Sequence, residues 1–566
     1  MWHCASDRNA GTERTGARAR PTPNPESRIP SPGFTVVEAS IDQMRLAMEQ
    51  GRATARDIVT QSLVRIATYE DRLNAAITIN PRALAEADER DRERKAGRIR
   101  GPLHGIPIAL KDNIHTTDMP TTGGALAFAQ LVPPYEATLT KNLRDAGAII
   151  IAKTVMTELA NWVSERMPTN YSSLASFGFN PYDPRRDPRA GVDGRPVLPT
   201  GGSSSGIGTA ASFWAANVGT ETSGSILSPS NQTMLVGIKP TVGRISRYGV
   251  IPIAADQDTP GPMARSVTDA AILLGVLESA SPDPNDAATK TCAAPPGRDY
   301  RRYLKREGLK GARIGVPRAY YYDGLGSPGE RGFSAGLNDA QRSVMQDAIA
   351  TLRAQGATVI DPADIPSIVT TDPAHSLARW SVCSGESDAK GRDDDCSIVF
   401  KYGMKRDFNA WLASLGDRAP VKTLEELRAW NRSHEATGTL KYGQSQLDIS
   451  DQMNLEADRA RYQRDRDADV TLAGREGIDA ALMTNKLDAI LFPGSGGAAI
   501  AAKPGYPTVI VPFGMVPNTS APSGIDSRPA PFGVSFTGTA CSEGRLIELA
   551  YAFEQATKRR IPPPLD

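Results

Sequence analysis

Cysteine, histidine and long apolar runs are scarce in this chain, and each scarcity excludes a class of protein. The 566 residues include five cysteines, a small and odd number that argues against a disulfide framework, so we expect mostly free thiols. Cys383 and Cys396 nevertheless bracket a polar loop and could pair in an oxidising compartment. The five histidines form no HExxH pair, which excludes the common zinc-hydrolase motif.

A surplus of charge of either sign is also missing. The formal net charge is +1, from 65 basic and 64 acidic residues, so no global field favours nucleic acid or an anionic membrane. The longest apolar runs, such as residues 148–152 and 489–492, are far shorter than a membrane span and fit buried strands. We therefore expect a soluble protein with no nucleic-acid partner and no integral membrane association.

The first 33 residues are rich in arginine, proline, serine and threonine, and they lack the apolar core of a signal peptide. We predict that residues 1–33 are disordered and that the protein is cytoplasmic. A secreted or periplasmic location is the alternative if a natural signal peptide is absent. Residues 34–566 are predicted to form a single domain, because no linker divides them cleanly.

Two kinds of hydrophobic pattern follow one another along that domain. Helical periodicity over residues 37–50, 54–66 and 81–95 predicts an N-terminal helical layer. After residue 101, short apolar strands alternate with helices, which predicts an α/β fold with a large, mostly parallel sheet covered by helices on both faces. The strands are expected at 106–110, 148–152, 312–316, 358–360, 489–492 and 508–512, and the helices at 137–146, 205–216, 266–277, 340–355 and 544–558. Residues 362–475 are expected to form a helical and loop insertion that shapes a substrate pocket.

Two serine-rich turns and one lysine carry the strongest chemical signal. The turns are GGSSSG at residues 201–206 and GTETSGS at residues 219–225, and Lys111 lies upstream. A serine becomes a nucleophile only when a base removes its proton and hydrogen-bond donors await the oxyanion. The apolar residues 106–110 would bury Lys111, and burial lowers the pKa of a lysine so that it can act as a base.

Two other motifs overlap the first turn. Residues 202–206 match the GxSxG nucleophile elbow, which would make Ser204 the nucleophile, and residues 206–211 imitate a dinucleotide-binding fingerprint. The elbow needs a strand directly before it, but Pro199 interrupts that segment. The fingerprint also lacks its strand and its ribose-binding acid.

The motifs together resemble the signature blocks of the amidase signature family. The resemblance covers about residues 37 to 562, and it implies that family's fold, with a large mixed, mostly parallel central sheet, and its amide-hydrolysing activity. Leu227 stands where the glutamyl-tRNA amidotransferase component of this family usually has arginine, so the chain is most similar in motif to bacterial peptide amidases and broad-specificity amidases. The blocks are GPLHGIPIALKDN (101–113), AKT (152–154), ELA (158–160), GGSSSG (201–206), GTETSGSI (219–226), GIKPTVG (237–243), QDTPGPM (257–263) and LAYAFEQAT (549–557).

The resemblance also implies a Ser-cisSer-Lys triad. Ser225 would be the nucleophile, Ser203 a serine with a cis peptide bond, and Lys111 the terminal base. Ser204 would support the loop, and no metal or organic cofactor is expected. The oxyanion hole would be formed by the main-chain N–H groups of Thr222, Ser223, Gly224 and Ser225.

The function that follows is hydrolysis of a carboxylic amide to an acid and ammonia or an amine through an acyl-enzyme. Aryl amides, esters and carbamates are further candidate substrates, and the expected partner is a small molecule bound by a monomer or homodimer. An A-type subunit of a tRNA-dependent amidotransferase and a catalytically silent binding homologue remain as alternatives. The connection from Ser203 to Ser225 is shorter than in most relatives, and the shortening is expected near Trp214.

Overall fold

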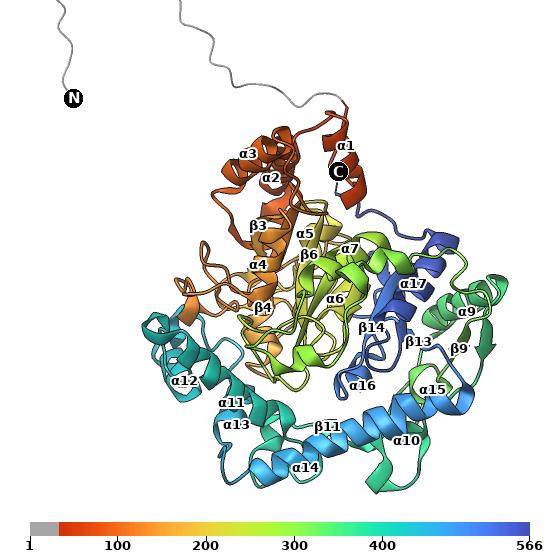
Figure 1. Cartoon of the computed structure of the whole chain (residues 1–566). Coiled ribbons are helices and arrows are strands. Elements are labelled where there is room, and N and C mark those ends of the chain that lie inside the picture. Colours follow the sequence, from red (N-terminus) through yellow and green to blue (C-terminus); the bar gives the residue numbers. More distant parts are fainter. Residues whose placement is uncertain (1–32, 566) are drawn as a thin grey trace, which may run out of the picture.

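An 11-stranded sheet forms the centre of the computed structural model, which describes residues 33–565 (Figure 1). The predicted disordered segment lies outside the described residues except for Gly33. In spatial order the strands are β1 (Ala76–Ile79), β3 (Ile149–Thr154), β2 (Pro107–Lys111), β6 (Ala216–Glu221), β8 (Thr259–Ala264), β7 (Val236–Lys239), β14 (Thr508–Val516), β15 (Ala530–Thr537), β13 (Ala489–Pro493), β9 (Arg313–Gly315) and β10 (Thr358–Ile360).

The sheet is mixed, as expected for the α/β fold. Strands β3, β2 and β6 run parallel to one another, as do β13, β9 and β10 at the other end. The central strands β8, β7, β14 and β15 pair in antiparallel fashion, which the alternating pattern did not predict. The physical reason is the connection: no helix separates β7 from β8 or β14 from β15, and antiparallel neighbours need no helical crossover.

Within residues 33–565, α-helices surround this sheet, and those that the sequence predicted begin close to the predicted positions. Ser40 and Thr54 start the first two helices with capping boxes, in which Gln43 and Asp57 return the hydrogen bond. The helices are α1 (Ile41–Glu49), α2 (Ala55–Leu73), α3 (Ala83–Lys95), α4 (Thr138–Asp145), α5 (Ile207–Ala210), α6 (Leu227–Gln232), α7 (Val267–Leu277), α8 (Arg318–Tyr321), α9 (Asp339–Ala354), α10 (Pro366–Val369), α11 (Val399–Ser414), α12 (Leu424–Ser433), α13 (Ser445–Asp451), α14 (Arg459–Val470), α15 (Asp479–Asn485), α16 (Ala498–Ala502) and α17 (Glu543–Thr557).

The helices cover both faces of the sheet. Helices α4, α7, α17 and α9 pack side by side in one layer, and α7 contacts β7 and β8 while α17 and α9 contact β14. Helix α6 packs from the other face against β7, β14 and β15. There Ile226 forms a separate apolar cluster with Leu235 and Met263. This helix follows directly after the second serine turn, so the sheet and α6 together determine where Ser225 lies.

The helix predicted at residues 205–216 is wrong in length. Helix α5 has only the four residues Ile207–Ala210, and strand β6 already begins at Ala216. The reason is Trp214, which is fully buried, packs against Gly208 and donates a hydrogen bond from Nε1 to Thr209 Oγ1 at 2.8 Å. A Cβ at residue 208 would lie 2.1 Å from the indole, so the glycine is required for this packing.

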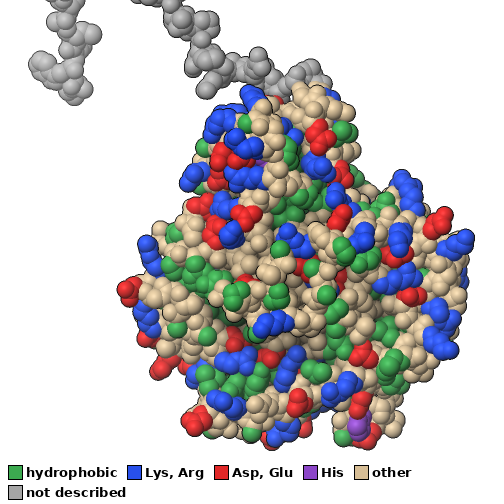
Figure 2. All heavy atoms as spheres, in the orientation of Figure 1, with side chains coloured by type: hydrophobic (Ala, Val, Ile, Leu, Met, Phe, Trp, Pro, Cys, Tyr) green, Lys and Arg blue, Asp and Glu red, His purple; other side chains and the backbone are tan. Residues whose placement is uncertain are grey.

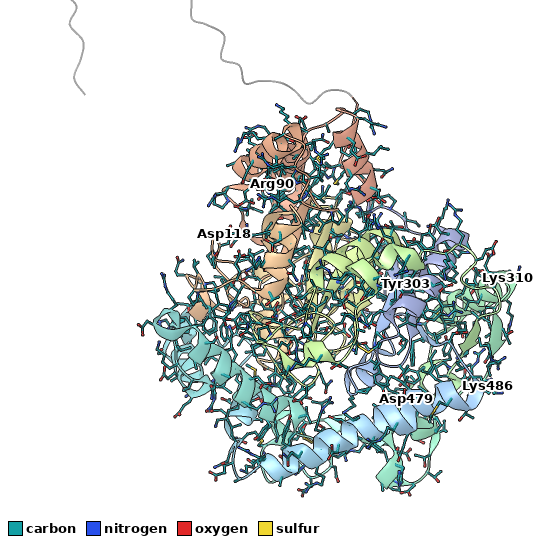
Figure 3. The ribbon with its side chains drawn as sticks, viewed as in Figure 1. Arg90, Asp118, Tyr303, Lys310, Asp479 and Lys486 are labelled. Carbon is teal, nitrogen blue, oxygen red and sulfur yellow. A yellow bond between two sulfur atoms is a disulfide. The ribbon has the colours of Figure 1, made fainter. Side chains whose placement is uncertain are left out.

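The expected insertion at residues 362–475 consists mainly of helices α10 to α14. It wraps around the lower edge of the sheet in Figure 1, where α14 continues through a π-helical turn, Thr471–Ile478, into α15. Figure 3 labels Asp479 and Lys486 at the two ends of α15. The Tyr506 hydroxyl donates a hydrogen bond to Asp479, so this helical rod is tied to the loop that precedes β14. Two short strands, β11 (Ser381–Val382) and β12 (Cys396–Ser397), pair within the insertion, and a second short pair, β4 (Tyr171–Ser172) and β5 (Ser176–Phe177), precedes the first serine turn.

The surface shows basic and acidic side chains in close mixture. On the face drawn in Figure 2, lysine and arginine alternate with aspartate and glutamate, and no large area of one sign is visible. Across residues 33–565, no helix combines the length and the apolar composition that crossing a membrane requires.

The prediction of mostly free thiols is wrong for the described residues. Cys383 pairs with Cys396, the pairing that the sequence left open, and Cys292 pairs with Cys541. The second pair is 249 residues apart in sequence, and the fold brings the segments around Thr241 and Thr291 against Cys541. Nothing in the cysteine spacing indicates such a long-range bond.

A thiol count tests both disulfides. We expect the unfolded, unreduced protein to show at most one reactive thiol per chain, because only Cys4 lies outside the two pairs. After reduction the count should rise to the five cysteines of the sequence. Ellman titration in denaturant measures both values, and two or more thiols per chain before reduction would contradict the pairing.

Candidate active site

Lys111 is the last residue of β2 and is completely buried. Its Nζ lies 2.7 Å from Ser203 Oγ, and it donates hydrogen bonds to Thr220 Oγ1 at 2.9 Å and Thr220 O at 3.1 Å. Burial lowers the pKa of Lys111 to about 7, although the negative charges of Asp258 and Glu221 oppose that shift. A neutral amine is therefore available near neutral pH, as the sequence predicted from the apolar strand.

The two serine-rich turns are packed directly against each other. A Cβ at residue 202 would lie 2.9 Å from Ser225 Cα and 3.1 Å from Gly224 O, so only glycine permits this contact. The Ser204 N–H donates a hydrogen bond to Ser225 O at 3.2 Å. Ser203 and Ser225, which the sequence places on separate turns, are thereby brought to one site together with Lys111.

The expected cis peptide bond at Ser203 is absent. Among the described residues the one cis peptide bond joins Asp361 to Pro362, and the bond before Ser203 is trans. The trans form is the ordinary state for a residue other than proline, and in it Ser203 Oγ already reaches Lys111. Among residues 33–565, no hydrogen bond joins the hydroxyl groups of Ser203 and Ser225. Such catalytic hydrogen bonds commonly tighten only when substrate is bound.

Ser225 occupies the turn between β6 and α6 and is 9% exposed. Within residues 33–565 its hydroxyl has no hydrogen-bond partner. The N–H groups of Ser223, Gly224 and Ser225 also make no hydrogen bond to the described chain, and Gly224 adopts a φ of 94°. Unpaired main-chain N–H donors beside a serine hydroxyl are what an oxyanion hole requires.

Ser204 has a different environment. It is fully buried, its hydroxyl donates to Thr220 O at 2.9 Å, and it accepts from the Thr220 N–H at 3.1 Å. No strand precedes it, since residues 197–200 have no regular structure. This geometry supports a bracing role and argues against the nucleophile elbow.

Several polar residues that hold Lys111 and the Ser225 turn in place were given no role in the sequence analysis. Thr220 Oγ1 accepts hydrogen bonds from Lys111 and from Asn113 Nδ2. Glu221 accepts from the N–H groups of Ile226 and Leu227 at 2.7 and 2.9 Å, which fixes the two residues that follow Ser225. Asn113, Thr220 and Glu221 stand inside the motif blocks, but only the tertiary contacts reveal their partners.

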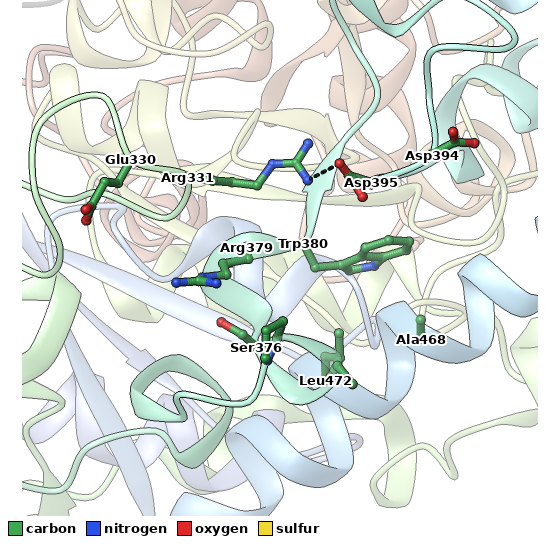
Figure 4. A pocket seen from close by; sticks show the side chains of 11 residues that line it. Glu330, Arg331, Ser376, Arg379, Trp380, Asp394, Asp395, Ala468 and Leu472 are labelled. Atoms are coloured by element: carbon green, nitrogen blue, oxygen red, sulfur yellow. Dashed lines mark ion pairs between the residues drawn. The ribbon is translucent and has the colours of Figure 1, made fainter.

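A hollow of about 600 Å³ lies elsewhere, within and beside the insertion (Figure 4). Trp380 and Arg379 line it together with Arg331, which forms an ion pair with Asp395 at 3.2 Å. None of the triad candidates lines this hollow. It is therefore separate from the site around Lys111.

Comparison with known proteins agrees with this architecture. The sequence matches the amidase family profile over residues 57–547. A probable amidase of Arabidopsis thaliana is 35% identical over 538 residues, covering 94% of this chain and 92% of the relative. A putative amidase of Arthroderma benhamiae is 33% identical over 558 residues, covering 93% and 86% of the two chains. The A-type component of the glutamyl-tRNA(Gln) amidotransferase of Thermosynechococcus vestitus is 32% identical over 542 residues, covering 91% and 98%.

A solved structure gives the same result in three dimensions. The peptide amidase of Stenotrophomonas maltophilia superposes with a TM-score of 0.77 at 35% identity, and the alignment covers 94% of this chain and 99% of that one. The match extends across the central sheet and its helices rather than over one motif. This chain belongs to the amidase family and is an amide-hydrolysing enzyme.

Proposed function

We propose that the protein is a serine-dependent amidase that uses Ser225, Ser203 and Lys111 and forms an acyl-enzyme. The observation that carries this proposal is the completely buried Lys111 Nζ, 2.7 Å from Ser203 Oγ, on a turn that packs against Ser225. The substrate would be a carboxylic amide, and the products an acid and ammonia or an amine. Aryl amides, esters and carbamates are the next substrates to test.

The proposed reaction is a relay of two proton transfers, from Ser225 to Ser203 and from Ser203 to Lys111. Neutral Lys111 accepts the Ser203 hydroxyl proton while Ser203 takes the proton of Ser225, and Ser225 Oγ forms a bond to the amide carbon. The main-chain N–H groups of residues 222–225 stabilise the negative oxygen that develops. Return of the proton to the leaving nitrogen breaks the C–N bond. Water then repeats the sequence and releases the acid.

A second function is favoured by a specific finding, the 32% identity to an amidotransferase component. A member of such a complex would need its partners for turnover, whereas a free-standing amidase would not. Release of ammonia from a simple amide by the purified chain alone, without ATP, tRNA or another protein, distinguishes the two. We propose the free-standing enzyme because Leu227, not arginine, follows the nucleophile turn.

The disulfides bear on where this enzyme works. Disulfides form and persist in oxidising compartments and are rare in the cytosol. We therefore propose an oxidising location, secreted or periplasmic, in place of the cytoplasmic location expected from the sequence.

Replacing the nucleophile tests the role of Ser225. We expect Ser225→Ala to lower kcat by roughly 10³-fold or more with the fold unchanged, because the attacking oxygen is lost. Ser204→Ala is the matched control on the neighbouring turn and should retain most of the activity. Steady-state assays with circular dichroism measure both, and an active Ser225→Ala or an inactive, folded Ser204→Ala would contradict the assignment.

The pH dependence tests the role of Lys111. Because the neutral amine is the base and its pKa is about 7, kcat/KM should rise with pH, reach half its maximum near pH 7 and level off in alkaline solution. Lys111→Arg should be as inactive as Lys111→Ala, since guanidinium cannot accept a proton. An arginine variant with wild-type turnover would show that position 111 supplies only positive charge.

A further inference from the structure

Thr222, the first residue of the proposed oxyanion turn, is held by two neighbours on the adjacent strand segment. Its hydroxyl donates a hydrogen bond to Asp258 Oδ1, and Gln257 Nε2 donates to Thr222 O at 3.3 Å. Strands β6 and β8 are antiparallel, with Glu221 opposite Thr259, so Asp258 is in register with Thr222. The start of β8 therefore sets the position at which the turn leaves β6.

Asp258 is itself fixed in orientation. The residue is 7% exposed, and its Oδ2 accepts hydrogen bonds from the N–H groups of Ile253 and Ala254 at 2.9 and 3.0 Å. All three donors point at one carboxylate. An amide at this position would turn an NH₂ group toward either the two N–H groups or the Thr222 hydroxyl, so it cannot replace the carboxylate.

The same carboxylate lies in the electrostatic environment of Lys111. Asp258 and Glu221 are the negative groups that raise the pKa of Lys111 against its burial. Arg247 and Asp407 face Asp258 from the neighbouring loop and from α11, and burial raises the pKa of Asp258 to about 7. A cavity of about 10 Å³ is lined by polar residues that include Thr222 and Asp258 and by apolar residues that include Ile251 and Ile253.

We infer that Asp258 is a positioning residue for the amidase reaction, which holds the oxyanion turn through its hydrogen bond with the Thr222 hydroxyl. This inference rests on the proposed function of Lys111 and Ser225. Within residues 33–565, Asp258 makes no hydrogen bond to Ser225, so it would act through Thr222. It reaches Thr222 because β8 lies next to β6 in the sheet.

The pH profile of the variant Asp258→Asn separates the effect of the lost hydrogen bond to Thr222 from the effect of the lost charge near Lys111. We expect kcat to fall by about 10- to 100-fold, with KM changed little, because a charge-assisted hydrogen bond to the turn is lost. Above about pH 7, where Asp258 is ionised, loss of its negative charge lowers the pKa of Lys111, so the midpoint of the kcat/KM profile should move to lower pH. A purely structural role would lower activity without moving that midpoint.

Two further variants serve as controls. Thr222→Val removes the hydroxyl but keeps the Asp258 charge, so kcat should fall while the midpoint stays in place. Asp256→Asn removes a carboxylate two positions away that pairs with Arg406 at 2.9 Å, and it should change neither value. If Asp258→Asn does not fold, Thr222→Val still tests whether the hydrogen bond between Thr222 and Asp258 positions the oxyanion turn.

The outcomes distinguish this inference from the proposed function. The role of Asp258 would be overturned if Asp258→Asn kept the wild-type kcat and the wild-type midpoint of the pH profile. It would also be overturned if Thr222→Val kept the wild-type kcat. In both cases an inactive Ser225→Ala would still support the proposed triad. An equal midpoint shift in Asp256→Asn would also overturn the role of Asp258, because the effect would then be one of general charge. Activity in Ser225→Ala would instead remove the proposed function.

Discussion

The chemistry proposed for this protein depends on the complete removal of one lysine from water. Lys111 ends a strand whose five residues are all buried, and burial brings the pKa of its amine down to about 7. At an exposed position the same side chain would stay protonated and could not accept a proton from serine. The sheet supplies the burial, because β2 lies between β3 and β6 and helix α2 packs against it.

The remaining parts of the site are arranged by strand order. Strand β6 passes beside Lys111 and presents Thr220 to its amine, then ends at the turn that carries Ser225. Strand β8 pairs with β6 and places Asp258 against Thr222, while Gly202 lets the first serine turn approach the second. The proposed base, relay serine, nucleophile and oxyanion donors thus come from segments far apart in sequence that the sheet and α6 bring together.

The sequence predicted those features that depend on local pattern. The α/β sheet flanked by helices and the starts of the helices that were predicted followed from periodicity, and the family followed from the motif blocks. What it missed depends on tertiary contacts: the antiparallel central strands, the shortening of α5 by Trp214 and the pairing of Cys292 with Cys541. The trans bond before Ser203 also differs from what the family resemblance implied, because a resemblance in residues does not determine one backbone angle.

The most direct test of the central claim is to find which atom becomes acylated. A fluorophosphonate reacts with an activated serine, and peptide mass spectrometry locates the adduct. The account predicts one adduct per active chain on Ser225, none in Ser225→Ala, and no change in labelling with excess chelator. An adduct on Ser204, or no adduct together with loss of amidase activity on chelation, would contradict it.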